Sequence, residues 1–150
     1  MAGEKTYIPN ITLGLNDKSI IPKIFKHYEE IVDRYNNKKI DIYYIEDNHN
    51  YVGRIIVDYD NRYLDTETIK NVRVCLSYLF IYPEYRRNGY ASKLIDYVLN
   101  DLLEQGYTEY TVGVEPENIP ALELYKDKGF TSLIDHSDKP FPFDLYLYKR

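Results

Sequence analysis

A chain of 150 residues, of which 44% are hydrophobic, is long enough to fill one core, so we expect a single domain over residues 1–150. Its formal net charge of -5 argues against a nucleic-acid partner, which requires clustered Lys and Arg, and any anion site must therefore be local. The single cysteine, Cys75, excludes an internal disulfide. The N-terminus lacks an apolar signal core and no apolar stretch is long enough to cross a bilayer, so we expect a cytoplasmic protein without a membrane partner.

The first half of the chain predicts one helix followed by three strands. Residues 19–37 carry apolar side chains at helical spacing, namely Ile24, Phe25, Tyr28, Ile31, Val32 and Tyr35. Residues 40–47 and 51–60 are rich in β-branched and aromatic residues, and the DNHN sequence between them favours a turn, so they predict a hairpin. Residues 71–82 form an apolar run that predicts a strand inside a sheet, ending before Pro83.

The second half of the chain alternates helices and strands. An apolar stripe at helical spacing begins at Ala91 and predicts a helix that ends at Gly106. The remaining predicted elements are a strand over 108–114, a helix over 116–129 that opens with Asn118 and Pro120, and strands over 130–135 and 143–149. This order predicts a mixed α/β sheet whose one evident crossover is the strand–helix–strand unit from residue 72 to 114.

The segment YRRNGYA, residues 85–91, joins the third strand to the long helix. The first N–H groups of a helix lack partners and the helix dipole is positive there, so this junction suits an anion. Gly89 lets the backbone approach a ligand, and Arg86 and Arg87 add planar donors suited to phosphate oxygens. A solvated turn with two surface arginines is the alternative. The segment lacks both the lysine of the nucleoside-triphosphate loop and the three-glycine dinucleotide fingerprint.

Two motifs in order indicate a family. The first is R-x-x-G-x-A at Arg86, Gly89 and Ala91, which follows a strand ending in I-x-P-E-Y. The second is N-x-x-A-x-x-L-Y-x-x-x-G-F, formed by Asn118, Ala121, Leu124, Tyr125, Gly129 and Phe130. In these motifs the chain resembles the GCN5-related N-acetyltransferase (GNAT) superfamily, most specifically over residues 72–131.

The resemblance implies a mixed, mostly antiparallel central sheet flanked by helices, with one parallel strand–helix–strand crossover that carries a loop for the pyrophosphate of CoA. It implies acetyl-CoA as the co-substrate. The loop residues that would contact the pyrophosphate are Arg86, Arg87, Asn88, Gly89, Tyr90 and Ala91, of which Arg87 is the least regular in the family and also suits a residue that faces solvent. The pantetheine arm would use main-chain hydrogen bonds of Leu79 and Ile81 and would meet Asn118, which also caps its helix.

Acetyl transfer needs a proton donor for the departing thiolate and a group that accepts the proton of the amine. By resemblance Tyr125 is the general acid, because a phenol with an ordinary pKa near 10 stays protonated at neutral pH; a core tyrosine is the alternative. Many family members place a glutamate on the strand before the loop, but residues 75–80 read CLSYLF. Base candidates are Glu115, Asp58 and Glu46, or a water chain, although each carboxylate also suits a solvated surface.

We therefore expect an N-acetyltransferase that moves an acetyl group from acetyl-CoA directly to a primary amine of a small molecule or a protein N-terminus. A non-catalytic acyl-CoA-binding or sensing module of the same fold is the alternative, and a structural domain that binds no CoA is a third hypothesis. The acid-rich segments 58–67 and 135–144 suit a cationic amine or are ordinary solvated loops. The three histidines, His27, His49 and His136, are too dispersed in sequence for a metal site, so we expect no metal. Whether the chain forms a homodimer stays open.

Overall fold

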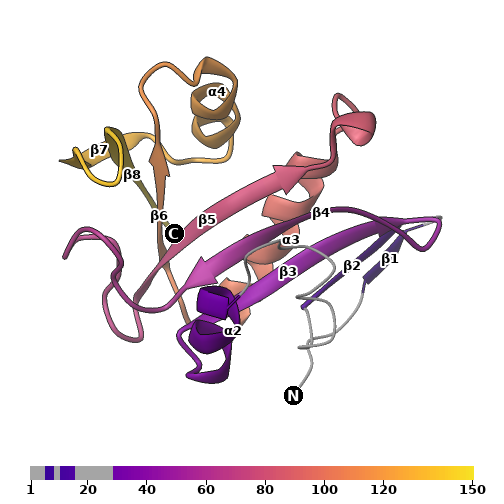
Figure 1. Ribbon diagram of the computed structural model, residues 1–150, viewed down its shortest axis with the longest axis horizontal. Coiled ribbons are helices and arrows are strands. Elements are labelled where there is room, and N and C mark those ends of the chain that lie inside the picture. The colour runs from indigo at the N-terminus through magenta and orange to yellow at the C-terminus, as the bar shows by residue number, and fades with distance from the viewer. Residues whose placement is uncertain (1–5, 9–10, 16–28) are drawn as a thin grey trace. The chain divides into compact units, whose positions relative to one another are not determined.

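The computed structural model describes the backbone of residues 6–8, 11–15 and 29–150 (Figure 1). The chain divides into two compact units, each built from two stretches. The first unit comprises residues 1–57 and 78–98, and the second comprises residues 58–77 and 99–150.

The described strands are β1 (Thr6–Ile8), β2 (Ile11–Leu15), β3 (Ile40–Asp47), β4 (Asn50–Asp58), β5 (Arg73–Ile81), β6 (Glu109–Val114), β7 (Ser132–Ser137) and β8 (Phe143–Lys149). The described helices are α2 (Glu29–Asn36), the short 3₁₀ helix η2 (Pro83–Tyr85), α3 (Tyr90–Glu104) and α4 (Ile119–Asp127). The strand order in the sheet is β1-β2-β3-β4-β5-β6-β8-β7. β5 and β6 are parallel, whereas β1–β2, β2–β3, β6–β8 and β7–β8 are antiparallel.

The core of the first unit is built mainly on β3 and β4, whose side chains are buried along most of their length. Helix α2 packs its Ile31 against Ile40, Ile42 and Ile56 of these strands. Acidic residues in its first turn and Arg34 in its last turn complement the helix dipole. The helix therefore gains stability both from its buried face and from its charges.

Gly53 allows β4 to approach β5 closely. A Cβ atom at this position would lie 2.2 Å from the carbonyl oxygen of Phe80 and 2.7 Å from Cδ1 of Ile81. The contact continues beyond the end of β5, because the N–H of Tyr82 donates to the carbonyl of Val52 at 2.9 Å. The backbone position of β5 at Phe80 and Ile81 therefore depends on a glycine in β4.

The second unit is built on β6, β8 and the first half of β5. β6 pairs with β8 from Glu109↔Lys149 to Val114↔Asp144, so the whole of β6 has a partner on this side. An ion pair between Arg73 and Glu109, 2.7 Å apart, spans the start of the parallel ladder of β5 and β6.

The predicted fold class is confirmed: a mixed, mostly antiparallel sheet flanked by helices, with the parallel crossover β5–α3–β6. The order predicted from residue 40 onward is also confirmed. Of the helix predicted over 19–37, α2 accounts for Glu29–Asn36, and residues 19–28 lie outside the described residues. β1 and β2 were not predicted, because strands of three and five residues carry little periodic signal. That residues 1–150 form a single domain stays a prediction.

Candidate active site

The segment between η2 and α3 is a turn whose shape is set by two residues with positive φ, Arg87 at 67° and Gly89 at 78°. Asn88, between them, donates from its side-chain amide to the carbonyl oxygens of Tyr85 at 3.0 Å and Arg86 at 3.1 Å. Helix α3 begins with the next residue after Gly89. Left-handed residues followed by a helix N-terminus present backbone N–H groups on one side, as in anion-binding nests.

The start of α3 is held on β3. The hydroxyl of Tyr90 donates to the carboxylate of Asp47, and this hydrogen bond raises the pKa of the Tyr90 phenol. Ala91 follows, half-buried in the first helical turn. The space beside the turn is open, because the nearest atom to a Cβ added at Gly89 would be Nζ of Lys93 at 4.0 Å. The side chain of Tyr90 is therefore engaged within the protein, whereas the turn itself is open to a ligand.

Arg86 ties the turn to the end of β5. Its Nε donates to the carbonyl of Ile81 at 2.8 Å, and its guanidinium carbon lies 5.3 Å from the centroid of the Phe80 ring. The guanidinium of Arg54 lies 4.7 Å from the same ring, and burial lowers the pKa of Arg54. In the described part of the chain the terminal amino groups of Arg86 have no hydrogen-bond partner, so they remain as donors for an anion. Arg87 is exposed.

β5 leaves its parallel partner halfway along its length. The ladder of β5 with β6 ends at Leu76↔Val112, and Tyr78 two residues later has a φ of 53° in mid-strand. The N–H of Tyr82 donates to Val52 of β4. In a strand the main-chain N–H and C=O groups of consecutive residues face opposite edges, so those of Ile81 face away from β4. An extended ligand could therefore use the N–H of Ile81, since its carbonyl already accepts from Arg86.

Tyr125 lies on α4 in the second unit. The predicted cap of this helix is confirmed, because Oδ1 of Asn118 accepts from the N–H of Ala121 at 3.3 Å. Tyr125 is 7% exposed, with its ring edge-on to Phe130 at 5.6 Å. Burial raises the pKa of its phenol, and the nearby Cys75 adds to this rise. Its hydroxyl has no hydrogen-bond partner within the described residues and is reached by solvent.

The comparison that decides the family covers both motifs. Residues 15–130 match the model of the acetyltransferase (GNAT) family. The chain belongs to the GNAT family. Solved structures agree on the fold: a GNAT family acetyltransferase from Elizabethkingia anophelis with acetyl-CoA bound has a TM-score of 0.74 at 14% identity, covering 95% of this chain and all of that one. Arabidopsis thaliana Naa50, in complex with the bisubstrate analogue CoA-Ac-MVNAL, has a TM-score of 0.72 at 17% identity, covering 94% and 99%.

Curated relatives match over a shorter region. Human N-acetyltransferase 8 is 34% identical over 67 residues, which is 45% of this chain and 30% of that protein. Bovine thialysine N-epsilon-acetyltransferase is 31% identical over 83 residues, 55% of this chain and 49% of that protein. The match therefore spans about half of these relatives or less.

The base candidates of this GNAT member lie in different surroundings. Glu115 is exposed at the end of β6, and Glu46 lies in β3 of the first unit, opposite Thr12 of β2. Asp58 is 2% exposed, and the Oγ of Ser77 donates to its Oδ2 at 2.6 Å. The alternative of a solvated surface carboxylate is therefore wrong for Asp58.

A second buried carboxyl, Glu67, was missed by the sequence analysis. It is 4% exposed and accepts hydrogen bonds from the N–H groups of Arg62 at 2.6 Å and Tyr63 at 3.3 Å. Burial raises the pKa of Glu67, and the charge of Asp58 contributes to the rise. The only sequence signal was the acid-rich segment itself, which does not distinguish a buried carboxyl from a solvated one.

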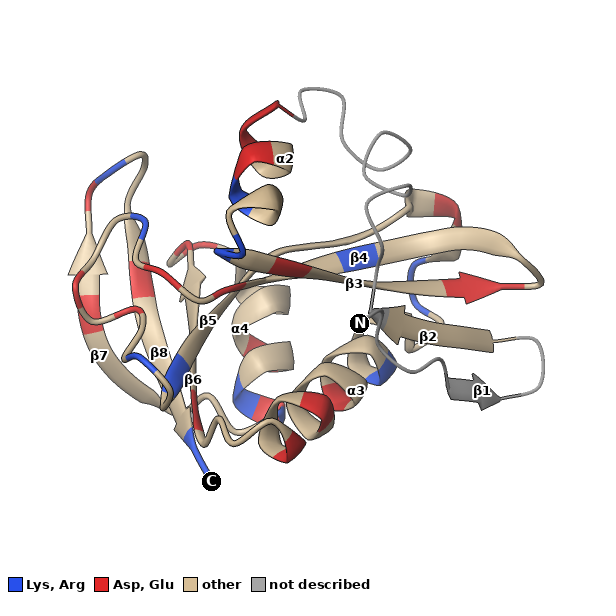
Figure 2. Ribbon diagram, turned by 90° about the horizontal axis from the view of Figure 1, so that it is seen from below, with Lys and Arg blue, Asp and Glu red and all other residues tan. Residues whose placement is uncertain are grey.

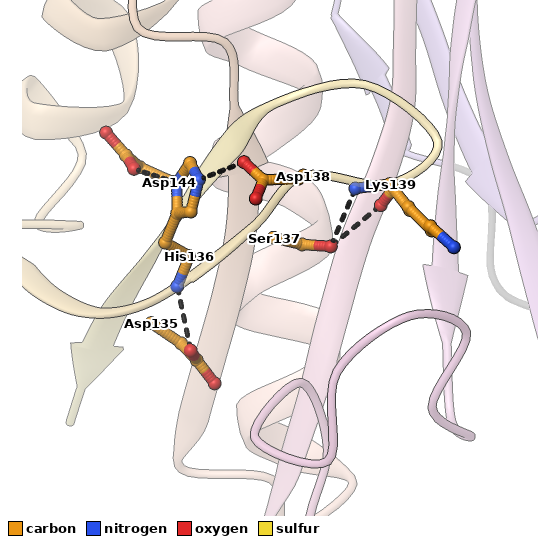
Figure 3. A network of polar contacts seen from close by, with 6 residues as sticks. All are labelled: Asp135, His136, Ser137, Asp138, Lys139 and Asp144. Atoms are coloured by element: carbon orange, nitrogen blue, oxygen red, sulfur yellow. Dashed lines mark hydrogen bonds and ion pairs between the residues drawn. The ribbon is translucent and has the colours of Figure 1, made fainter.

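The acid-rich hairpin of β7 and β8 holds an exposed histidine between two carboxylates (Figure 3). Nδ1 of His136 lies 2.9 Å from Asp144, and Nε2 lies 2.8 Å from Asp138. These contacts, with Asp138 first, raise the pKa of His136. The carboxylate of Asp135 accepts from Oγ1 of Thr66 at 2.5 Å, so the hairpin is joined to the other acid-rich segment.

Within residues 6–8, 11–15 and 29–150, no three His, Cys, Asp or Glu side chains form a group that could hold a metal ion. None of the helices in these ranges combines the length and apolar character that a membrane span requires. Lys and Arg are distributed over many elements and do not gather on a single one (Figure 2).

Proposed function

We propose that this chain is an acetyl-CoA-dependent N-acetyltransferase that moves the acetyl group directly to a primary amine of a small molecule or a protein N-terminus. The observation that carries the proposal is Tyr125, which is 7% exposed and whose hydroxyl is reached by solvent and has no hydrogen-bond partner in the described residues. A buried ring with its hydroxyl at the surface has an apolar body and a polar tip. Such a hydroxyl can donate to a ligand without first losing a partner in the protein.

The proposed place of CoA follows from the turn and from β5. The pyrophosphate would contact the backbone N–H groups between Arg86 and Ala91 and the free donors of Arg86. The pantetheine arm would run back along β5, beyond the point where the ladder with β6 ends. There it would use the N–H groups of Leu79 and Ile81. The solved GNAT structures with acetyl-CoA bound support this ligand class.

The raised pKa of Tyr125 limits what this residue can do for the leaving group. A thiol has an ordinary pKa near 8.5, so transfer of a proton from a phenol at 10 or above to a thiolate is unfavourable by at least about 2 kcal/mol. Tyr125 therefore acts first as a hydrogen-bond donor that stabilises negative charge on sulfur as the C–S bond breaks. The proton follows as the thiolate leaves.

The acceptor is a primary amine by analogy with two similar proteins. One is a thialysine N-epsilon-acetyltransferase, and the other is Naa50, whose bisubstrate analogue is CoA-Ac-MVNAL. The acid-rich segments 58–67 and 135–144 support a cationic acceptor. A sensing module that binds acyl-CoA without catalysis is the second candidate, and the absence of a carboxylate in residues 75–80 favours it.

A thermal-shift panel followed by an amine screen tests the proposal. Acetyl-CoA and CoA should raise the melting temperature, because a ligand that binds only the native state stabilises it. Acetylation of thialysine, ethylenediamine or the peptide MVNAL should then be detected as release of CoA thiol. Absence of any shift with CoA, acetyl-CoA or longer acyl-CoAs would overturn the proposal. Binding without acetylation of any amine would favour the sensing module.

A further inference from the structure

Asp58 and Ser77 form a pair at which a buried carboxylate meets a more accessible hydroxyl. The Oγ–Oδ2 distance of 2.6 Å is that of a strong O–H···O⁻ bond. Asp58 is 2% exposed, whereas Ser77 is half-buried. Ser77 is therefore the member of the pair that is partly open to solvent, whereas Asp58 is enclosed.

The groups around Asp58 form a poorly solvated acidic cluster. Glu67 and Cys75 both interact electrostatically with Asp58, and burial raises the pKa of each of them. Arg62 supplies charge of the opposite sign near Cys75. Glu67 is already occupied, because its carboxylate accepts from the N–H groups of Arg62 and Tyr63. Asp58 is therefore the member of the cluster that accepts a hydrogen bond from a partly exposed residue, Ser77.

The position of Ser77 along β5 connects this pair to the proposed reaction. Ser77 directly follows Leu76, where the ladder with β6 ends, and precedes Tyr78 with its positive φ. A pantetheine arm that passes Ile81 and then Leu79 from a pyrophosphate at residues 86–91 would bring its thioester end beside Tyr78 and Ser77. This placement rests on the proposed function.

We infer that Ser77 and Asp58 form a proton relay for the acceptor amine. As the amine nitrogen bonds to the thioester carbonyl carbon, its N–H proton passes to Oγ of Ser77 while the Ser77 hydroxyl proton passes to Oδ2 of Asp58. The C–S bond then breaks, its electron pair leaves on sulfur, and the thiolate takes the proton of Tyr125. Exchange with solvent afterwards removes the proton from Asp58 and returns one to Tyr125.

The relay explains how a chain without a carboxylate in residues 75–80 can have a base. A hydroxyl is a weak base by itself, but it donates and accepts at once, so it can pass a proton to a carboxylate that the substrate cannot touch. The ammonium group of the carbonyl adduct is far more acidic than the ammonium form of the free amine. A carboxylate is therefore a sufficient acceptor for its proton. Ser77 is thus a catalytic residue and Asp58 the final acceptor. Glu115, the sequence-based candidate, is not needed.

The test compares Ser77→Ala, Ser77→Thr and Asp58→Asn with the parent over pH, using the amines thialysine, ethylenediamine and MVNAL. Ser77→Ala should lower kcat by about 10²- to 10³-fold with the acetyl-CoA-induced thermal shift retained. Ser77→Thr, which keeps the hydroxyl, should restore most of this rate. Asp58→Asn should remove the acidic limb of the rate profile. The exposed Glu104→Gln is the matched control for loss of one carboxylate in the second unit and should behave as the parent.

The outcomes separate the relay from the function on which it rests. A parent protein that acetylates none of the amines overturns the proposed function and the relay with it. A parent that acetylates, together with a Ser77→Ala variant of parental rate and an unchanged acidic limb, overturns the relay alone, even if Asp58→Asn does not fold. A limb that disappears in Glu115→Gln also overturns the relay. A purely structural pair would lower the melting temperature of Ser77→Ala without changing the limb.

Discussion

The first and second units offer a ligand different kinds of chemical group. In the first unit the turn from Arg86 to Ala91 is largely exposed and offers backbone N–H groups, with its shape fixed by positive φ at Arg87 and Gly89. In the second unit the polar groups are buried side chains: Tyr125, Asp58 and Glu67 are 7%, 2% and 4% exposed. The first unit thus suits recognition of an anion, and the second suits proton transfer.

The difference has a physical reason. Anion binding by N–H groups needs only the correct backbone conformation, which a few adjacent residues can specify. Proton transfer needs groups whose protonation is set by a low-dielectric environment, and such an environment exists only inside a packed core. The first function is therefore local in sequence, and the second depends on the whole unit.

The largest expected effect is that of Tyr125→Phe in the second unit. The ring and its contact with Phe130 remain, but the only proton that the residue can donate is removed. We expect kcat to fall by about 10²- to 10⁴-fold, while the thermal shift by acetyl-CoA is nearly unchanged. Steady-state kinetics with chemistry shown to be the slow step measures this. A parental rate would refute the acid role, and a loss of stability alone would indicate that the phenol is structural.

The next largest effect is expected for Gly53→Ala in the first unit. The added Cβ overlaps the backbone of β5 at Phe80, which cannot move as a flexible side chain does, so we expect a loss of about 3 kcal/mol in the free energy of unfolding. Because Ile81 shifts with Phe80, acetyl-CoA binding should weaken as well.

Gly106→Ala is the matched control for this change. A Cβ there meets no atom within 4 Å, so only its φ of 100° is unfavourable, and we expect about 1 to 2 kcal/mol. Urea denaturation of both variants gives the two values. A loss for Gly53→Ala no larger than that for Gly106→Ala would contradict the expected cost of the overlap between β4 and β5.

Arg86→Ala should weaken acetyl-CoA binding by about 1 to 3 kcal/mol, the scale of a charge-assisted hydrogen bond. Part of the loss is indirect, because the carbonyl of Ile81 also loses its donor. Arg87→Ala removes the same charge from an exposed neighbour and should have a smaller effect. Isothermal titration at low and high salt measures both, and the effect should shrink as salt screens the contact. Equal effects for the two arginines would contradict a specific role for Arg86.

The sequence was sufficient for most of the fold, for the turn and for naming Tyr125, and insufficient for the pairing of Ser77 with Asp58 and the burial of Glu67. Sequence patterns, with the cap at Asn118, predicted every strand and α-helix from residue 40 onward but not the short η2. The turn and Tyr125 were found because each lies in a short motif. The pairing of Ser77 with Asp58 could not be predicted, because these residues are 19 positions apart and only the packed sheet brings them together. The burial of Glu67 was hidden for the same reason, since a segment with four acids usually predicts a solvated loop.

The smallest expected effect concerns His136, which is exposed, unlike Asp58 and Glu67 of the same unit. The hydrogen bonds that the imidazole donates to the carboxylates, to Asp138 first and then to Asp144, raise its pKa above the ordinary value of 6.5. The protonated form is therefore favoured in the folded hairpin. The stabilisation from this cluster is complete below pH 6.5 and disappears as the pH rises through the raised pKa.

NMR titration of the His136 imidazole should show the raised pKa in the parent and a lower pKa in Asp138→Asn. Thermal unfolding should show His136→Gln losing stability relative to the parent only on the acidic side, with His49→Gln as the control for loss of an exposed histidine. A parent and His136→Gln that differ equally at all pH values would mean that the cluster acts through neutral hydrogen bonds, because a charge-dependent contact must vanish when the imidazole loses its proton.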